Sequence, residues 1–288
     1  LEQNPALTDG WVFKGIALDD QGLHEEAIAA FDTSIRINPS LSDAAIRRSI
    51  SLFRLGRYEE ATEGFNRALE INPNDARAWC FKGISQLRQE RFEDAVRSFD
   101  RGIENDRRCA RAYYEKGNAL SRLNRQLEAV IAYEKALEIK PSHAPAYYQK
   151  GVALAQKERY DEAISAFESA IAIDPQNAEG YYYLGIALAG RDRYDDAIRA
   201  FESCLSLSPD NIAAYYYKGI AHIQSSQYEQ AVSAFEKTIE SEPSNPLAYY
   251  YLGIALLQSK KFEECIAAFT TSIELDPALS DAWMYQGI

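Results

Sequence analysis

Apolar residues recur along the chain at helical spacing and are separated by short polar segments. One stripe with the i, i+3, i+4, i+7 spacing of an amphipathic helix consists of Tyr181, Leu184, Gly185 and Leu188. A second stripe follows it and consists of Ala197, Ile198, Phe201, Cys204 and Leu205. The polar segment "GRDRYDD" between them is too short for anything but a tight reversal, so the pattern predicts two antiparallel helices.

This helix pair recurs every 34 residues without an insertion. A glycine marks the first helix at Gly15, Gly83, Gly117, Gly151, Gly185, Gly219, Gly253 and Gly287, and Ser49 fills the remaining place. Counted from Thr8, the repeats are expected at 8–41, 42–75, 76–109, 110–143, 144–177, 178–211, 212–245 and 246–279, with 1–7 ending a preceding repeat and 280–288 starting a ninth. A fixed period of this length predicts one solenoid over 1–288, although the length alone suggests about two globular domains.

Other repeat positions are as regular as the glycine. Position 4 is aromatic in most repeats, as in Trp79 and Tyr181, position 20 is Ala except for Cys265, and position 24 is Phe except for Tyr133. Proline stands near the end of every full repeat but one. This pattern resembles the tetratricopeptide repeat family over nearly the whole chain. The resemblance implies an all-α, right-handed α-solenoid (superhelix) whose first helices line a concave groove.

Consecutive tyrosines point in different directions, because each residue turns a helix by about 100°. On this basis Tyr181 lies on the core stripe, whereas Tyr182 and Tyr183 lie nearly opposite it, where the resemblance implies the groove. Position 5 carries Tyr114, Tyr148, Tyr182, Tyr216 and Tyr250; position 6 carries Tyr183, Tyr217, Tyr251 and Tyr285; position 9 carries Val152, Ile186, Ile220 and Ile254. These columns predict a peptide-binding surface. The alternative is that the tyrosines only stack and fill the inside of the superhelix.

Charge is distributed unevenly along the expected groove. Its edges in repeats 2 to 4 carry Arg54, Arg77, Arg88, Arg111 and Arg122, with Asn118 as the polar floor residue. Residues 42–143 hold 19 basic and 16 acidic side chains, whereas residues 144–288 hold 10 and 20. We therefore expect a ligand with an acidic part on repeats 2–4 and an apolar or aromatic part on repeats 5–8. The alternative is that these arginines are solvated and paired with local acids.

One well-known subclass of the family binds a terminal carboxylate, and this chain does not match its pattern. Asn118 has the required place, but the flanking positions carry Tyr114, Gln149 and Tyr183 instead of the clamp residues. Binding of chaperone tails is therefore not expected.

Catalytic and cofactor motifs are not seen in the sequence. The three histidines, His24, His143 and His222, occupy different repeat positions, and the four cysteines lack C-x-x-C spacing. Acidic pairs as in "YDEA" are read as favourable charges at helix N-termini. A sequence pI near 4.9 argues against nucleic acid. We expect no enzyme, no cofactor and no metal.

The expected function is a protein-interaction scaffold that binds an extended peptide or a helical segment. The alternative is a structural or self-assembly module that associates through the array ends or the convex face. The ends at "LEQNP" and "DAWMYQGI" are interpreted as cuts within a longer array, which could associate end to end. No signal peptide or transmembrane run is visible, and free cysteines favour the cytoplasm.

Overall fold

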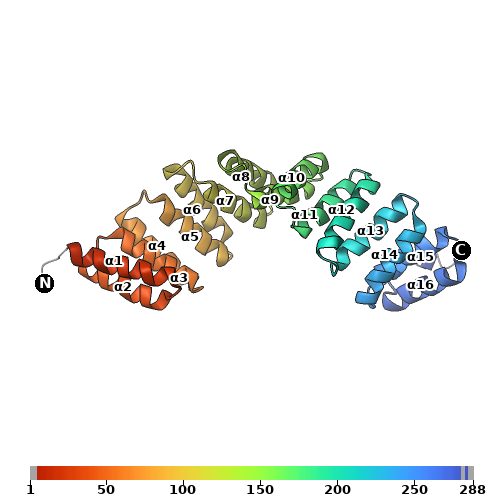
Figure 1. Ribbon diagram of the computed structural model, residues 1–288, viewed down its shortest axis with the longest axis horizontal. Coiled ribbons are helices and arrows are strands. Elements are labelled where there is room, and N and C mark those ends of the chain that lie inside the picture. The colour runs from red at the N-terminus through yellow and green to blue at the C-terminus, as the bar shows by residue number, and fades with distance from the viewer. Residues whose placement is uncertain (1–4, 280–282, 285–288) are drawn as a thin grey trace. The chain divides into compact units, whose positions relative to one another are not determined.

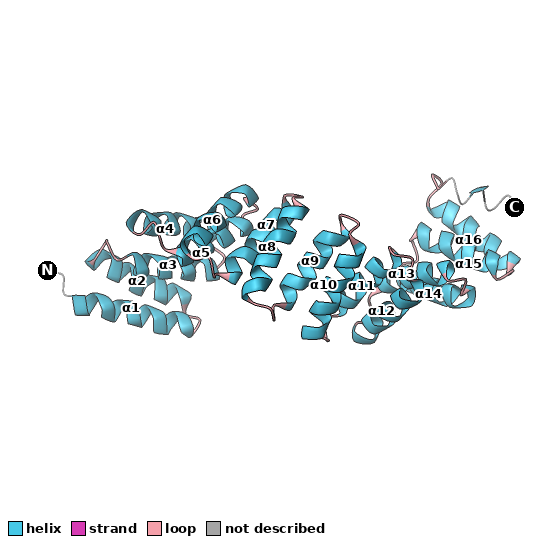
Figure 2. Ribbon diagram, turned by 90° about the horizontal axis from the view of Figure 1, so that it is seen from above, coloured by secondary structure: helices cyan, strands magenta, loops and turns pink. Residues whose placement is uncertain are grey.

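Helices account for all the regular secondary structure of the described residues, which are 5–279 with Trp283 and Met284 in this computed structural model. This part of the chain contains sixteen helices and no strand, and Figures 1 and 2 show their order along the chain. Their bounds are α1 Pro5–Asp20, α2 His24–Ile37, α3 Ser42–Arg54, α4 Tyr58–Ile71, α5 Ala76–Arg88, α6 Phe92–Asn105, α7 Ala110–Arg122, α8 Gln126–Ile139, α9 Ala144–Ala155, α10 Tyr160–Ile173, α11 Ala178–Ala189, α12 Tyr194–Leu207, α13 Ile212–Gln224, α14 Tyr228–Ser241, α15 Pro246–Gln258 and α16 Phe262–Leu275.

The helices form pairs within two compact units. Unit 1 is Leu1–Ser142 and contains α1 to α8; unit 2 is His143–Ile288 and contains α9 to α16. Each odd-numbered helix packs on the even-numbered helix that follows it, as the sequence pattern predicts. Within a unit, each odd-numbered helix also contacts the next odd-numbered helix, for example α5 with α7 and α11 with α13. The first helices of neighbouring repeats therefore lie side by side in each unit.

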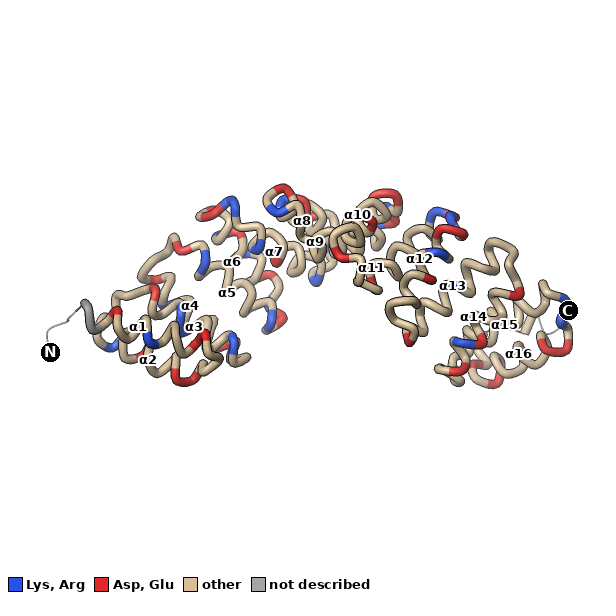
Figure 3. Tube along the Cα trace, in the orientation of Figure 1, with Lys and Arg blue, Asp and Glu red and all other residues tan. Residues whose placement is uncertain are grey.

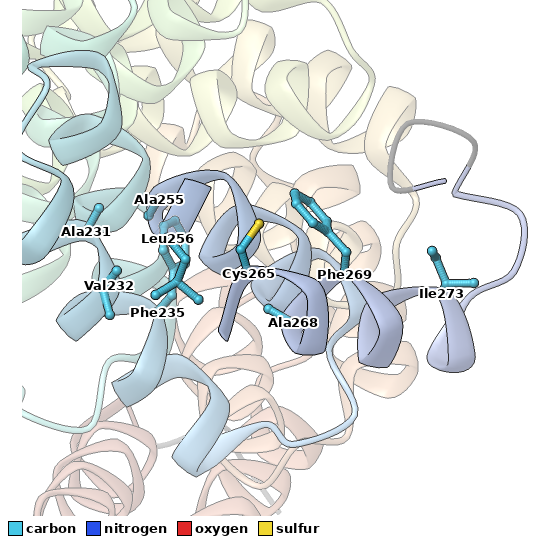
Figure 4. Close-up of a cluster of buried hydrophobic side chains, with 9 residues drawn as sticks. All are labelled: Ala231, Val232, Phe235, Ala255, Leu256, Cys265, Ala268, Phe269 and Ile273. Atoms are coloured by element: carbon cyan, nitrogen blue, oxygen red, sulfur yellow. The ribbon is translucent and has the colours of Figure 1, made fainter. Parts of the chain in front are cut away.

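The repeat glycine is required by the phenylalanine of the same repeat. A Cβ placed on Gly185 would lie 2.6 Å from the ring of Phe201, which is fully buried. The same close approach joins Gly151 to Phe167 and Gly219 to Phe235. The ring of α12 thus rests directly on the backbone of α11, and no larger residue fits between the helices without displacement. Figure 4 shows the resulting core in unit 2, with Phe235 and Phe269 among small and aliphatic side chains.

A residue with positive φ reverses the chain between the two helices of a repeat. Gly22 and Gly56 occupy this place in the first two repeats, with φ of 79° and 77°. Six later repeats use non-glycine residues there with φ of 58° to 60°, namely Glu90, Asn124, Glu158, Asp192, Ser226 and Lys260. The conformation is therefore imposed by the packing of the helices, because it is unfavourable for residues with a Cβ.

Side-chain caps start several of the odd-numbered helices. Asp75, Asn177, Asn211 and Asn245 accept hydrogen bonds from backbone N–H groups in the first turn of the helix that follows, and His143 Nδ1 accepts one from Ala146. These caps satisfy N–H groups that have no partner within the helix.

The two ends of the chain are described only in part. α1 begins at Pro5, three residues before the expected repeat start at Thr8, and proline is tolerated in a first helical turn. Residues 1–4 lie outside the described part, as do Tyr285, Gly287 and most of the expected ninth repeat at 280–288.

Candidate peptide-binding face

Seven tyrosine rings form an unbroken chain of contacts across the first helices of unit 2. In order, the rings are Tyr148, Tyr183, Tyr182, Tyr217, Tyr216, Tyr251 and Tyr250, with centroids 5.0 to 6.0 Å apart and mostly edge-to-face orientations. Contacts within a repeat, such as Tyr182 with Tyr183, alternate with contacts between repeats, such as Tyr182 with Tyr217. We name these seven residues the tyrosine face.

The tyrosine face is anchored on the core. Tyr182 contacts Phe201 of its own repeat at 6.2 Å, and Tyr183 stacks on Phe167 of the preceding repeat at 6.1 Å. A helical wheel places Tyr182 and Tyr183 nearly opposite the core and does not predict these contacts. The core rings reach the two tyrosines because the repeat glycine lets the second helix approach the first closely. Six of the seven tyrosines are half-buried, and Tyr217 is exposed at 39%.

Burial also changes the chemistry of the tyrosine hydroxyls. Loss of solvent raises the pKa of Tyr182 to about 12, and it raises the pKa values of Tyr148 and Tyr216 further. The Tyr148 hydroxyl donates a hydrogen bond to Glu179 Oε2 of the next repeat at 3.2 Å. Tyrosine hydroxyls can both donate and accept a hydrogen bond, so the face offers hydrogen-bonding groups beside apolar ring surface.

Few charges lie on the first helices that carry the tyrosine face. α15 has no charged residue, α13 has only Lys218 besides His222, and α11 has only Glu179. In Figure 3 these helices are mostly tan, whereas acidic and basic positions gather elsewhere. The aliphatic residues Val152, Ile186, Ile220 and Ile254 are half-buried on the same helices. The face is thus apolar and aromatic with hydroxyl groups.

In unit 1 the corresponding positions are used differently. The Tyr114 ring lies 6.0 Å from Tyr133, whose hydroxyl donates a hydrogen bond to Asn118 Oδ1 at 2.9 Å. Asn118 Nδ2 in turn donates to Glu115 Oε2 at 3.0 Å. The structure therefore places Tyr114 and Asn118 in a network internal to the repeat.

Three of the five predicted arginines form ion pairs with the preceding repeat. Arg54 pairs with Asp19, Arg77 with Asp43 at 2.9 Å, and Arg122 with Glu90 at 3.5 Å. Arg54 and Arg77 also line a cavity of about 230 Å³ in unit 1, together with Ile16, Asp19, Asp20, Phe31, Arg47, Ile50 and Phe81. These arginines are thus partly neutralised by acids of the same unit, as the alternative interpretation of the sequence has it.

Arg111 and Arg88 have different surroundings. The guanidinium of Arg111 lies 5.0 Å from the ring centroid of Phe81, a cation–π arrangement, and Arg88 is exposed in the last turn of α5. Sequence reasoning missed Phe81, which occupies position 6 and stacks on Phe65 at 6.2 Å as Tyr183 does on Phe167. Its place in the position 6 column was a signal that could have found it.

The described residues hold no group of three or more His, Cys, Asp or Glu side chains arranged to bind a metal ion. Among the described helices, none has both the length and the apolar character that crossing a bilayer requires.

These features define a helical-repeat protein: helix pairs recur every 34 residues, and a glycine of the first helix packs against a phenylalanine of the second. The sequence model of the family described as Tetratricopeptide repeat matches residues 14–76, 46–95, 81–144, 133–178 and 148–212, and the chain belongs to this family. A second model, described as Anaphase-promoting complex, cyclosome, subunit 3, matches residues 190–272. Curated proteins contain no significant sequence match to the chain.

Several solved structures share the fold. The crystal structure of YrrB, described as a TPR protein with an unusual peptide-binding site, is 24% identical, has a TM-score of 0.61 and aligns over 66% of this chain and 97% of its own. MamA from Desulfovibrio magneticus RS-1 is 27% identical, with a TM-score of 0.57 over 59% of this chain and 97% of its own. The C-terminal part of a TPR protein from Cytophaga hutchinsonii is 20% identical, with a TM-score of 0.70 over 83% of this chain and 98% of its own.

Proposed function

We propose that the chain is a protein-interaction scaffold whose tyrosine face binds an extended peptide or a helical segment. The observation that carries the proposal is the unbroken chain of seven rings over four repeats. Tyrosine offers a large, rigid surface and a hydroxyl, and little side-chain entropy is lost when a ligand binds it. YrrB has the same fold and is described as having a peptide-binding site, which is consistent with this function.

The shape of the face favours a ligand with apolar or aromatic side chains at regular intervals. Repeats 5 to 7 each present the same pair of rings, one from position 5 and one from position 6 of the next repeat, beside one half-buried aliphatic residue. A ligand that inserts a side chain at each repeat would bury ring surface without leaving a charge unpaired. The hydroxyls can then bind its backbone or polar groups.

Unit 1 is proposed to bind an acidic segment at Arg88 and Arg111. Arg54, Arg77 and Arg122 already have acidic partners, so an acidic ligand would compete with those pairs, whereas Arg111 rests on Phe81. Replacing Arg88 and Arg111 together by Glu is expected to weaken binding of an acidic peptide and to reduce its dependence on salt. Unchanged affinity at low and high salt would contradict this assignment.

The tyrosine face can be tested with a random peptide library selected on the immobilised chain. Enriched peptides would be measured by calorimetry against wild type, Tyr217→Ala and the double variant Tyr182→Ala with Tyr216→Ala. Tyr217→Ala removes the most open ring of the face, and we expect it to lower affinity about tenfold, which is about 1.4 kcal/mol. Ile173→Ala is the matched control, because Ile173 is 39% exposed, as Tyr217 is, and lies on a second helix.

Circular dichroism would first establish that each variant is folded. Peptides that bind all variants alike, or a library that enriches no peptide, would contradict the proposal. Affinity lost in the control and retained in Tyr217→Ala would move the site to the second helices.

Self-association is the second candidate function, because exposed apolar residues also lie on second helices. Leu127 and Ile131, four residues apart on α8, are 53% and 58% exposed, and Phe262 and Ile266 on α16 are 59% and 54% exposed. Light scattering over a range of concentrations tests this function. A mass that rises with concentration in wild type and stays constant in Ile131→Glu with Ile266→Glu would support it, and a constant monomer mass would contradict it.

A further inference from the structure

A basic residue in the middle of several first helices pairs with an acid on the second helix of the preceding repeat. The basic residue is at position 7 of its repeat and the acid is at position 25. Three of these ion pairs are Arg48 with Asp32 at 2.6 Å, Lys116 with Asp100 at 2.5 Å and Lys218 with Glu202 at 2.9 Å. The Lys218 side chain is only 20% exposed, so its aliphatic stem is largely covered while its amine reaches the acid.

Repeat 8 has leucine in the place of this basic residue. Position 7 is Lys or Arg in repeats 1 to 5 and in repeat 7, whereas repeats 6 and 8 have Leu184 and Leu252. The acid that would face position 7 of repeat 8 is Glu236 of repeat 7. Glu236 is exposed and, within the part of the chain that the structure describes, forms no ion pair. The acid of the usual pair is therefore present and its cation is missing.

Leu252 and Glu236 line one pocket of about 400 Å³ between α14, α15 and α16. Its apolar wall consists of Val232 of α14, Leu252 and Leu256 of α15 and Ala268 of α16, and Figure 4 labels all of these except Leu252. Repeats 3 and 5 have pockets at the corresponding positions, and there position 7 contributes Lys82 and Lys150 to the lining. The pocket of repeat 8 thus differs in having an apolar residue at position 7.

The charges that line this pocket favour a cation. Glu236 and Glu264 are the acids, and Lys261 is the base. Lys261 Nζ lies 3.9 Å from Glu264 Oε2, so the base of the pocket already has an acidic neighbour. Glu236 lies on a different helix and keeps its negative charge for a ligand.

We propose that this pocket binds a lysine or arginine side chain, flanked by apolar residues, of a partner protein. The bound side chain takes the place that Lys218 has one repeat earlier: its stem lies on Leu252 and Leu256, and its charged end reaches Glu236 as Lys218 reaches Glu202. The tyrosine face contributes no residue to the lining of the pocket. The site is therefore a second one, with a preference for a cation that the tyrosine face does not have.

The test titrates two short capped peptides into the full chain and follows isotope-labelled methyl groups by NMR. One peptide has lysine between two leucines, and the other has norleucine in place of the lysine, which keeps the stem and removes the charge. We expect the lysine peptide to shift the methyl signals of Leu252, Leu256 and Thr271 and to bind about fivefold more tightly than the norleucine peptide. Added salt should reduce this difference. Glu236→Gln should abolish it.

Glu240→Gln is the matched control, because Glu240 is on the same helix, pairs with Lys237 at 2.7 Å and does not line the pocket. This variant and Tyr217→Ala should keep the wild-type preference for the lysine peptide. Equal affinity of the two peptides for wild type, or no shift of the pocket methyl signals, would overturn the proposal. Loss of binding in Tyr217→Ala would do the same, because it would place the peptide on the tyrosine face. The comparison of the two peptides needs wild type alone, so it does not depend on the folding of any variant.

Discussion

Gly64 on α4 lies directly against Ser49 on α3, so that in this repeat the glycine is on the second helix instead of the first. A Cβ built on Gly64 would lie 2.2 Å from Ser49 Oγ, whereas the first helices of all other full repeats have glycine in the place of Ser49. Those repeats have Ala or Ser in the place of Gly64. The hydroxyl of Ser49 donates to Ala45 O at 2.7 Å and is held against α4. The absence of a side chain at Gly64 thus provides the space that the Ser49 side chain occupies between α3 and α4.

This exchange predicts that Gly64→Ala is destabilising and that Ser49→Gly compensates it. We expect Gly64→Ala to lower the free energy of unfolding by about 1–3 kcal/mol, because the added Cβ overlaps Ser49 Oγ. The double variant, which has the glycine and alanine of other repeats, should recover most of this loss. Urea denaturation followed by circular dichroism measures the effect, with Gly10→Ala as control because no atom lies within 4 Å of a Cβ there. Additive losses in the double variant would show that the two residues are not coupled.

The reversal between paired helices gives a second prediction. Glu158 has φ of 58°, whereas Gly56 at the equivalent place of repeat 2 has φ of 77°. Glu158→Gly should raise the stability of unit 2 by about 1 kcal/mol, because a Cβ is unfavourable in this conformation, and Gly56→Ala should lower that of unit 1 by a similar amount. Melting temperatures of the two variants measure both effects. A lower melting temperature for Glu158→Gly would mean that local interactions of the glutamate outweigh backbone strain.

The sequence was sufficient for the helix pairs because period and spacing directly report which face of a helix is buried. The requirement for glycine beneath a phenylalanine is a contact between positions 8 and 24, both of which the repeat pattern marks. The surroundings of a half-buried tyrosine were harder to predict. Tyr182 lies between solvent and Phe201, and a helical wheel describes one helix without its neighbours.

Gly102 gives a third prediction, because it is the one glycine among small residues at its repeat position. Other repeats have Ala, Ser, Cys or Thr there, and a Cβ on Gly102 would lie 3.4 Å from Ala76 O and Trp79 Cβ. Gly102→Ala should therefore stabilise α6 by about 0.5–1 kcal/mol, since alanine is the better helix former. Hydrogen exchange of amides in α6 measures the change, and amides of α14 in unit 2 are the internal control. Faster exchange in α6 of the variant would show that the contact with α5 is too tight for a methyl group.

His222 gives a fourth prediction, because it occupies a core position that is leucine in most other repeats. The side chain is only 5% exposed, and its Nδ1 donates to Gln227 Oε1 at 3.0 Å. Burial is the main cause that lowers the pKa of His222 from its usual 6.5, with a smaller contribution in the same direction from Lys218, against the opposing effects of Gln227, Glu202 and Asp195. The folded protein therefore resists protonation at a pH where the unfolded chain accepts it.

The sign of the pH effect follows from this difference in proton binding. Well above pH 6.5, the pKa of the imidazole in the unfolded chain, the side chain is neutral in both states, and its contribution to stability is complete. As the pH falls from there to the lower pKa of the folded state, the unfolded chain binds more protons, and stability is lost at up to about 1.4 kcal/mol per pH unit. Below the folded pKa no further loss arises from this group.

His222→Leu should therefore show a smaller drop in melting temperature between pH 7.5 and pH 5 than wild type. Gln86 occupies the same repeat position in unit 1 and has no titrating group, so Gln86→Leu is the control and should keep the wild-type drop. An equal drop in His222→Leu and wild type would assign the acid sensitivity of the chain to its carboxylates instead.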